Sequence, residues 1–137
     1  MESYAVQPGH VYWMKVNAWP QLALAFRKAG KPRPAVSPAP AVSHQAPLIM
    51  APATAGRAHC FRSQASQDKV LFLTVPVAGL APPGESVFLL QMARPAPRAA
   101  LGWFIGMLAP EDCQTLVERW LNLQLSYMNL TFPDQIP

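Results

Sequence analysis

The chain has 137 residues, the length of one ordinary domain that can bury a hydrophobic core. Hydrophobic residues make up 51% of it and charged residues only 13%, about half the usual share, which excludes a disordered, highly charged chain. The 16 prolines are roughly twice the average frequency and exclude a helix bundle.

The net charge of +4 is unevenly distributed. No acidic residue lies between Glu2 and Asp68, whereas this stretch contains seven lysines and arginines. Such a segregated charge favours a polyanionic partner, either nucleic acid or an acidic protein segment, and a solubilising basic face is the alternative. The basic residues are Lys15, Arg27, Lys28, Lys31, Arg33, Arg57 and Arg62.

Nothing in the sequence indicates secretion or membrane insertion. The first ten residues lack the basic and apolar regions of a signal peptide, and no apolar run reaches the ~18 residues of a membrane span. Cys60 and Cys113 are compatible with one disulfide or with two buried thiols. We therefore expect a cytoplasmic protein.

The first half of the chain predicts two strands and two long connections. Aromatic and β-branched residues predict a strand at 10–16, followed by a loop over 17–30. The prolines on both sides of Arg33 predict extended backbone over 31–37. The Pro/Ala-rich segment 38–47 is interpreted as a loop between strands of the same domain.

Four further strands are predicted from apolar runs. A short buried strand at 48–50 is expected to end in a turn at 51–56. Residues 69–76 form the clearest strand pattern of the chain, and 86–91 and 101–108 predict two more. Because these runs are continuous rather than alternating, both faces of the sheet are expected to be covered.

The C-terminal region changes to a helical period. After a turn at 82–84 and an extended connection at 94–98, Pro110 opens a helix predicted over 110–125, with a frayed tail at 126–137. The sequence thus predicts a single mostly-β, α+β domain, a small barrel over about 7–108 with a C-terminal amphipathic helix. The apolar stripe of this helix comprises Cys113, Leu116, Val117, Trp120 and Leu121.

No metal site or cofactor site is predicted. The histidines and cysteines lack the paired spacing of metal ligands, and the chain has no glycine-rich phosphate loop and no nucleophile elbow. The residues considered are His10, His44, His59, Cys60 and Cys113.

RNA cleavage through the ribose 2′-hydroxyl is compatible with the remaining polar residues. The planar guanidinium of Arg33 suits a charged phosphate, and the hydroxyl of Thr54 suits a phosphate oxygen. A surface charge and a turn residue are the plainer interpretations of these two positions. A histidine pair, His44 and His59, is a rival acid and base.

Aromatic residues add one candidate contact to nucleic acid. Trp13, Trp103 and Trp120 are expected in the core, whereas Trp19, beside a proline in a loop, is a candidate for stacking on a base.

Five collinear segments resemble the MazF/PemK-type toxins. They are Gly9–Trp13, Lys31–Pro38, Ile49–Thr54, Val87–Arg94 and Ile105–Asp112, which resemble in order the family's G-x-[IV]-x-W strand, its R-P strand, its strand ending in P-x-T, its D-Q strand and the entry to its final helix.

This resemblance implies an SH3-like barrel that forms a homodimer. It also implies a metal-independent, sequence-selective endoribonuclease that cleaves single-stranded RNA, inhibits translation and is neutralised by a cognate antitoxin. The family's catalytic arginine and threonine fall on Arg33 and Thr54. By analogy the basic loop with Arg27 and Lys28, together with Lys31, would bind RNA, and Gln91 would lie near the site. Trp19, the stacking candidate, completes the predicted RNA contacts.

The sequence departs from the family at two acidic positions, where it carries Lys15 and Leu90. The alternative function is a non-catalytic barrel that binds a protein partner or nucleic acid, with 38–47 recognised as an extended proline-rich strip.

Overall fold

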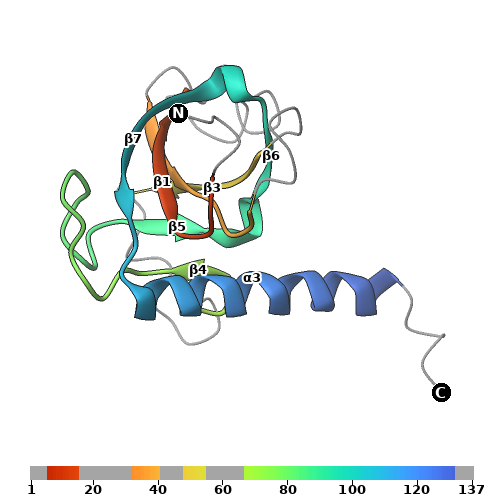
Figure 1. The fold of residues 1–137 in the computed structure, drawn as a ribbon. Helices are drawn as coiled ribbons and strands as arrows, with labels where there is room; N and C mark the ends of the chain where they lie inside the picture. Colours follow the sequence, from red (N-terminus) through yellow and green to blue (C-terminus); the bar gives the residue numbers. More distant parts are fainter. Residues whose placement is uncertain (1–5, 16–31, 41–47, 55–66, 132–137) are drawn as a thin grey trace.

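A computed structural model of the chain describes residues 6–15, 32–40, 48–54 and 67–131 (Figure 1). Seven strands and two 3₁₀ turns precede one long helix along these residues. The elements are β1 (His10–Met14), β2 (Arg33–Val36), β3 (Leu48–Thr54), β4 (Val70–Leu71), β5 (Val87–Leu89), η3 (Leu90–Met92), β6 (Arg94–Ala96), η4 (Arg98–Ala100), β7 (Leu101–Met107) and α3 (Pro110–Thr131).

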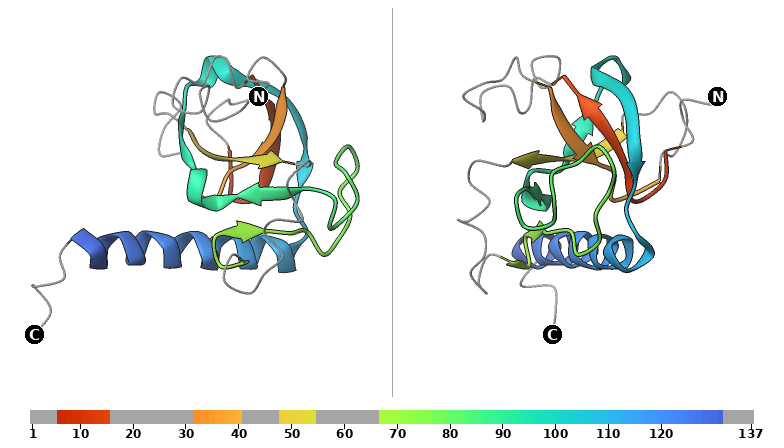
Figure 2. Two further views of the ribbon diagram at one scale, coloured as in Figure 1. Left: turned by 180° about the vertical axis from the view of Figure 1, so that it is seen from behind. Right: turned by 90° about the vertical axis from the view of Figure 1, so that its left-hand side faces the viewer.

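The strands form one antiparallel sheet in the order β4-β5-β3-β2-β1-β7, with β6 paired to β3. The sheet curls strongly, and α3 lies across one end of it beside β4 (Figures 1 and 2). The predicted mostly-β, α+β fold is therefore confirmed. Among the strands that the structure describes, no pairing joins β4 to β7, so hydrogen bonds do not close the sheet into a barrel.

Both faces of the central strands are covered, as the continuous apolar runs predict. In β2, Ala35 packs into one hydrophobic cluster with Met50, and its neighbour Val36 packs into a second cluster with Phe88. The second cluster also contains Leu116 of α3. The helix thus covers the cluster that contains Val36, and β2 and β3 lie between this cluster and the one that contains Ala35.

The helix is longer than predicted. It begins at Pro110 as expected, with Glu111 and Asp112 in its first turn, but it continues to Thr131 instead of fraying after 125. Leu123, two turns after Leu116, is still buried in the same cluster, so packing against the sheet supports the later turns.

The turn predicted at 51–56 is wrong for its described part, because β3 continues to Thr54. Ala51 and Ala53 are buried in this extension, which pairs with β2 through Pro52 and with β5 through Thr54. Pairing on both sides therefore outweighs the local turn preference of the small residues and proline.

The strand predicted at 69–76 is also wrong beyond its first residues, since β4 comprises only Val70–Leu71. The backbone N–H groups of Thr74 and Val75 donate to the carboxylate of Asp112, at 3.0 and 3.1 Å, instead of to a neighbouring strand. A further correction concerns 94–98, where Arg94–Ala96 forms β6 rather than an unpaired connection.

The expectation of a core position for Trp103 is wrong as well. Its side chain is 71% exposed on β7, an end strand of the sheet, with Phe104 and Met107 also exposed. Trp13 and Trp120 are half-buried.

Candidate active site

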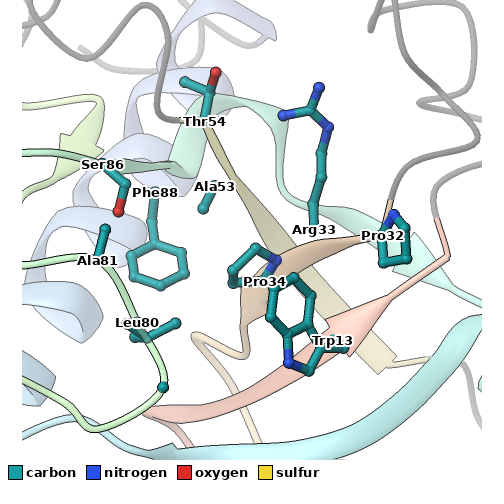
Figure 3. Close-up of a pocket in the computed structure, with 11 residues that line it drawn as sticks. Trp13, Pro32, Arg33, Pro34, Ala53, Thr54, Leu80, Ala81, Ser86 and Phe88 are labelled. Atoms are coloured by element: carbon teal, nitrogen blue, oxygen red, sulfur yellow. The ribbon is translucent and has the colours of Figure 1, made fainter.

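A pocket of about 220 Å³ opens where β1, β2, β3 and β5 meet the segment between β4 and β5 (Figure 3). Its lining contains both residues that the sequence proposes as catalytic. The lining residues are Trp13, Pro32, Arg33, Pro34, Ala53, Thr54, Gly79, Leu80, Ala81, Ser86 and Phe88.

The pairing of β2 with β3 brings Arg33 and Thr54 together. The antiparallel register sets Ala35 opposite Pro52, and continuing it by two residues sets Arg33 opposite Thr54. Residues directly opposite each other in antiparallel strands extend their side chains to the same face. Figure 3 shows the guanidinium and the hydroxyl on the same side of the pocket.

The backbone around Arg33 is stiffened by its neighbours. Pro32 and Pro34 flank the residue, and strand pairing sets Pro34 opposite Trp13. Arg33 is half-buried, and burial lowers the pKa of its guanidinium from the ordinary value. A partly desolvated arginine interacts more strongly with a phosphate than one in bulk water, because the surrounding dielectric is lower.

The rest of the pocket is mostly apolar. Phe88 is 1% exposed and forms part of the lining, with the half-buried side chains of Trp13 and Leu80 nearby (Figure 3). Ser86 contributes a hydroxyl on the side away from Arg33 (Figure 3). Polar groups at one rim and an apolar hollow beside them are typical of small-ligand sites.

Gln91, predicted to bind RNA, does not line this pocket. It lies in η3, where its backbone N–H donates to the carbonyl of Lys69 at 3.2 Å. Its side-chain Oε1 is buried and accepts no hydrogen bond from any residue that the structure describes. The neighbouring Leu90, at a position where the resemblance expects an acid, is buried in the core.

The other predicted RNA contacts, Trp19, Arg27, Lys28 and Lys31, lie outside the described residues, as do His44 and His59. His10 is described but does not line the pocket. It lies in β1, its Nδ1 accepts a hydrogen bond from the Gln7 N–H at 3.4 Å, and burial lowers its pKa.

Ser86, Leu80 and Phe88 are pocket residues that sequence reasoning missed. The motif that resembles the D-Q strand includes Phe88, but only as part of a strand. The sequence signal for these residues is the predicted turn at 82–84, in which the Glu85 N–H donates to the Pro82 carbonyl at 3.1 Å. A turn brings the residues before and after it close together, as it does here for Leu80 and Ser86.

Within the described ranges, no three His, Cys, Asp or Glu side chains gather closely enough to hold a metal ion. No helix in this part of the chain is both long and apolar enough to cross a membrane.

The sequence matches no protein-family model and no curated protein sequence. Among solved structures, the fold is similar to an endoribonuclease from Mycobacterial species, with a TM-score of 0.57 and 13% sequence identity. The superposition covers 89% of this chain and 92% of that protein. At this identity the likeness establishes the fold, and it extends over nearly the whole of both chains.

Proposed function

We propose that the protein is an endoribonuclease that cleaves single-stranded RNA at the pocket containing Arg33 and Thr54. The observation that carries this proposal is the position of these two side chains, opposite each other in the β2–β3 register and on the same side of one pocket. The likeness to an endoribonuclease fold supports it independently.

In this proposal the ribose 2′-hydroxyl attacks the adjacent phosphorus and its proton passes to solvent. The new P–O2′ bond forms as the P–O5′ bond breaks, which leaves a 2′,3′-cyclic phosphate and a 5′-hydroxyl. The guanidinium of Arg33 stabilises the charge on the pentavalent phosphorane and supplies the proton to the leaving 5′-oxygen. The Thr54 hydroxyl donates a hydrogen bond to a non-bridging oxygen. The lowered pKa of Arg33 favours proton donation.

The finer proposal is a MazF/PemK-type toxin, cytoplasmic and homodimeric, that is neutralised by an antitoxin. The five collinear motifs support it, and so does the acid-free stretch between Glu2 and Asp68, which suits a polyanionic substrate. A protein partner is supported by Trp103, Phe104 and Met107, which expose large apolar side chains along one end strand.

The test is cleavage of labelled single-stranded RNA by the purified protein in EDTA. Wild type should produce fragments with cyclic phosphate ends, and Arg33→Ala and Thr54→Ala should lower kcat by about 10²–10³-fold. Arg94→Ala is the matched control, because that arginine is exposed, does not line the pocket and donates to the nearby backbone carbonyls of Gln91 and Ala93. Cleavage by Arg33→Ala at the wild-type rate would overturn the assignment.

The second candidate is a non-catalytic domain that binds a protein partner, which the exposed apolar residues of β7 favour. Induction in bacterial cells separates the two candidates. A toxin slows growth and fragments RNA, and Arg33→Ala does neither. A binding domain leaves RNA intact, and its effects persist in Arg33→Ala.

A further inference from the structure

The pocket divides into a polar rim and an apolar hollow, and the hollow has no role in the chemistry proposed above. Arg33 and Thr54 lie at the rim, while Trp13, Leu80 and Phe88 line the hollow (Figure 3). Its volume of about 220 Å³ is below the ~300–1,000 Å³ of pockets that hold drug-sized ligands, which suits one flat ring system.

One wall of the hollow comes from a single segment, residues 79–86, which we name the wall segment. Gly79, Leu80, Ala81 and Ser86 all line the pocket. Ser86 is half-buried and is the wall segment's polar side chain in the lining, so it offers a donor and an acceptor to whatever occupies the hollow.

The chain is fixed to the rest of the fold before it reaches the wall segment. The carboxylate of Asp112, only 2% exposed, accepts the Thr74 hydroxyl at 2.7 Å and the N–H groups of Thr74 and Val75. These bonds tie the residues after β4 to the first turn of α3.

A second attachment lies on β7. A Cβ at Gly79 would lie 3.0 Å from Ile105 Cγ2, and a Cβ at Gly106 would lie 3.2 Å from Val77 Cγ1. Gly79 also has a φ of +92°, a conformation that favours glycine. The close packing and the turn closed by the Leu80 N–H on the Val77 carbonyl, at 3.1 Å, hold the wall segment against the sheet.

We infer that the hollow receives one nucleobase next to the phosphate to be cleaved, and that the wall segment selects this base through Ser86. The inference rests on the proposed function for the position of the phosphate. A base attached to the neighbouring ribose stacks on the half-buried Trp13, above the floor of the hollow to which the buried Phe88 contributes, and the Ser86 hydroxyl bonds to its edge. Asp112 is a positioning residue, because it holds Thr74 and Val75, which lead into the wall segment, and does not line the pocket.

The test is base preference. Wild type and variants cleave a pool of single-stranded RNAs of random sequence, and sequencing of the new ends gives the preference at each position beside the cut. Ser86→Ala should reduce the preference at one adjoining position by about five- to tenfold and leave the other positions unchanged. Ser126→Ala, an exposed serine on α3, is the matched control and should retain the wild-type preference.

Two further variants test the wall itself. Ala81→Leu, at an exposed lining residue, narrows the hollow and should shift the preference towards the smaller pyrimidine bases. Asp112→Asn should weaken preference at the same position as Ser86→Ala, whereas Glu111→Gln, its exposed neighbour in the first turn of α3, should not. If Asp112 only stabilises the fold, Asp112→Asn will lower Tm and leave the base preference unchanged, which would overturn its positioning role.

Binding of all-deoxy oligonucleotides, which lack the 2′-hydroxyl, separates this inference from the proposed function. If wild type cleaves no RNA but binds these probes with a base preference that Ser86→Ala removes, cleavage is overturned and the base site stands. If wild type cleaves RNA while Ser86→Ala and Ala81→Leu both keep its preference, the base site is overturned and cleavage stands. If wild type neither cleaves RNA nor binds the probes, both are overturned.

Discussion

By extension of the β2–β3 register, Arg33 at the start of β2 lies opposite Thr54 at the end of β3. Twenty residues separate them in the sequence, yet both side chains line one pocket (Figure 3). A guanidinium and a hydroxyl arranged in this way can hold two oxygens of one phosphate.

Replacing Arg33 by lysine separates charge from geometry. Arg33→Lys keeps a cation but loses the planar fork that matches two phosphate oxygens. We expect its kcat to fall between those of wild type and Arg33→Ala, measured on the same labelled RNA. Wild-type activity in Arg33→Lys would show that charge alone suffices and would contradict the two-oxygen contact.

Substitution of Gly9 is predicted to destabilise the fold for two reasons, its backbone conformation and a close contact, which a double variant can separate. Its φ is +90°, and a Cβ there would lie 2.9 Å from the Cys113 Sγ. Gly9→Ala should therefore cost about 1–3 kcal/mol of unfolding free energy, measured by urea denaturation. Cys113→Ala removes the sulfur, so the double variant should recover the steric part of the loss and retain the part due to φ. Strict additivity of the two substitutions would contradict the contact.

The stability of the fold should depend on His10 at mildly acidic pH. Burial lowers its pKa below 6.5, so the unfolded chain binds the proton more readily than the folded one. Stability contributed by neutral His10 is therefore present above pH 6.5 and lost as the pH falls below it. His10→Gln should flatten the difference in unfolding free energy between pH 7 and pH 5.5, and an unchanged slope in the variant would contradict the prediction.

Two aromatic residues are expected to differ sharply in their contribution to stability. Phe88 is 1% exposed in the core, so Phe88→Ala should cost about 3–5 kcal/mol. Trp103 is 71% exposed, so Trp103→Ser should change the unfolding free energy by less than about 0.5 kcal/mol while altering self-association, measured by light scattering. A large loss of stability in Trp103→Ser at a concentration where the protein is monomeric would contradict its exposed position.

Local signals in the sequence were sufficient for several elements of the fold. Aromatic and β-branched residues marked β1 and β7, and Pro110 with two acidic neighbours marked the start of α3. These elements agree with the predictions because propensity, helix capping charge and tertiary packing favour the same structure.

The errors arose where distant residues decide the conformation. Thr74 and Val75 have strand-forming neighbours, but Asp112, 38 residues beyond Thr74, accepts their backbone hydrogens. Thr54 resembles a turn residue locally, yet pairing with Val87 of β5 keeps it extended. Trp103 is apolar but lies on an end strand, which periodicity does not reveal.

The same distinction applies to the candidate site. Residue chemistry together with the family resemblance proposed Arg33 and Thr54, but their placement in one pocket depends on the register of β2 and β3. Ser86 and Leu80 were missed because their place in the pocket depends on a segment held by Asp112 and β7.

Hydrogen bonds donated by Thr74 and Val75 to the Asp112 carboxylate join α3 to the chain that leads into the pocket wall. The helix carries the carboxylate in its first turn and projects past the sheet towards its C-terminal end (Figure 1). A ligand or protein that tilted α3 would therefore also displace Thr74 and Val75, the residues that lead into the wall segment.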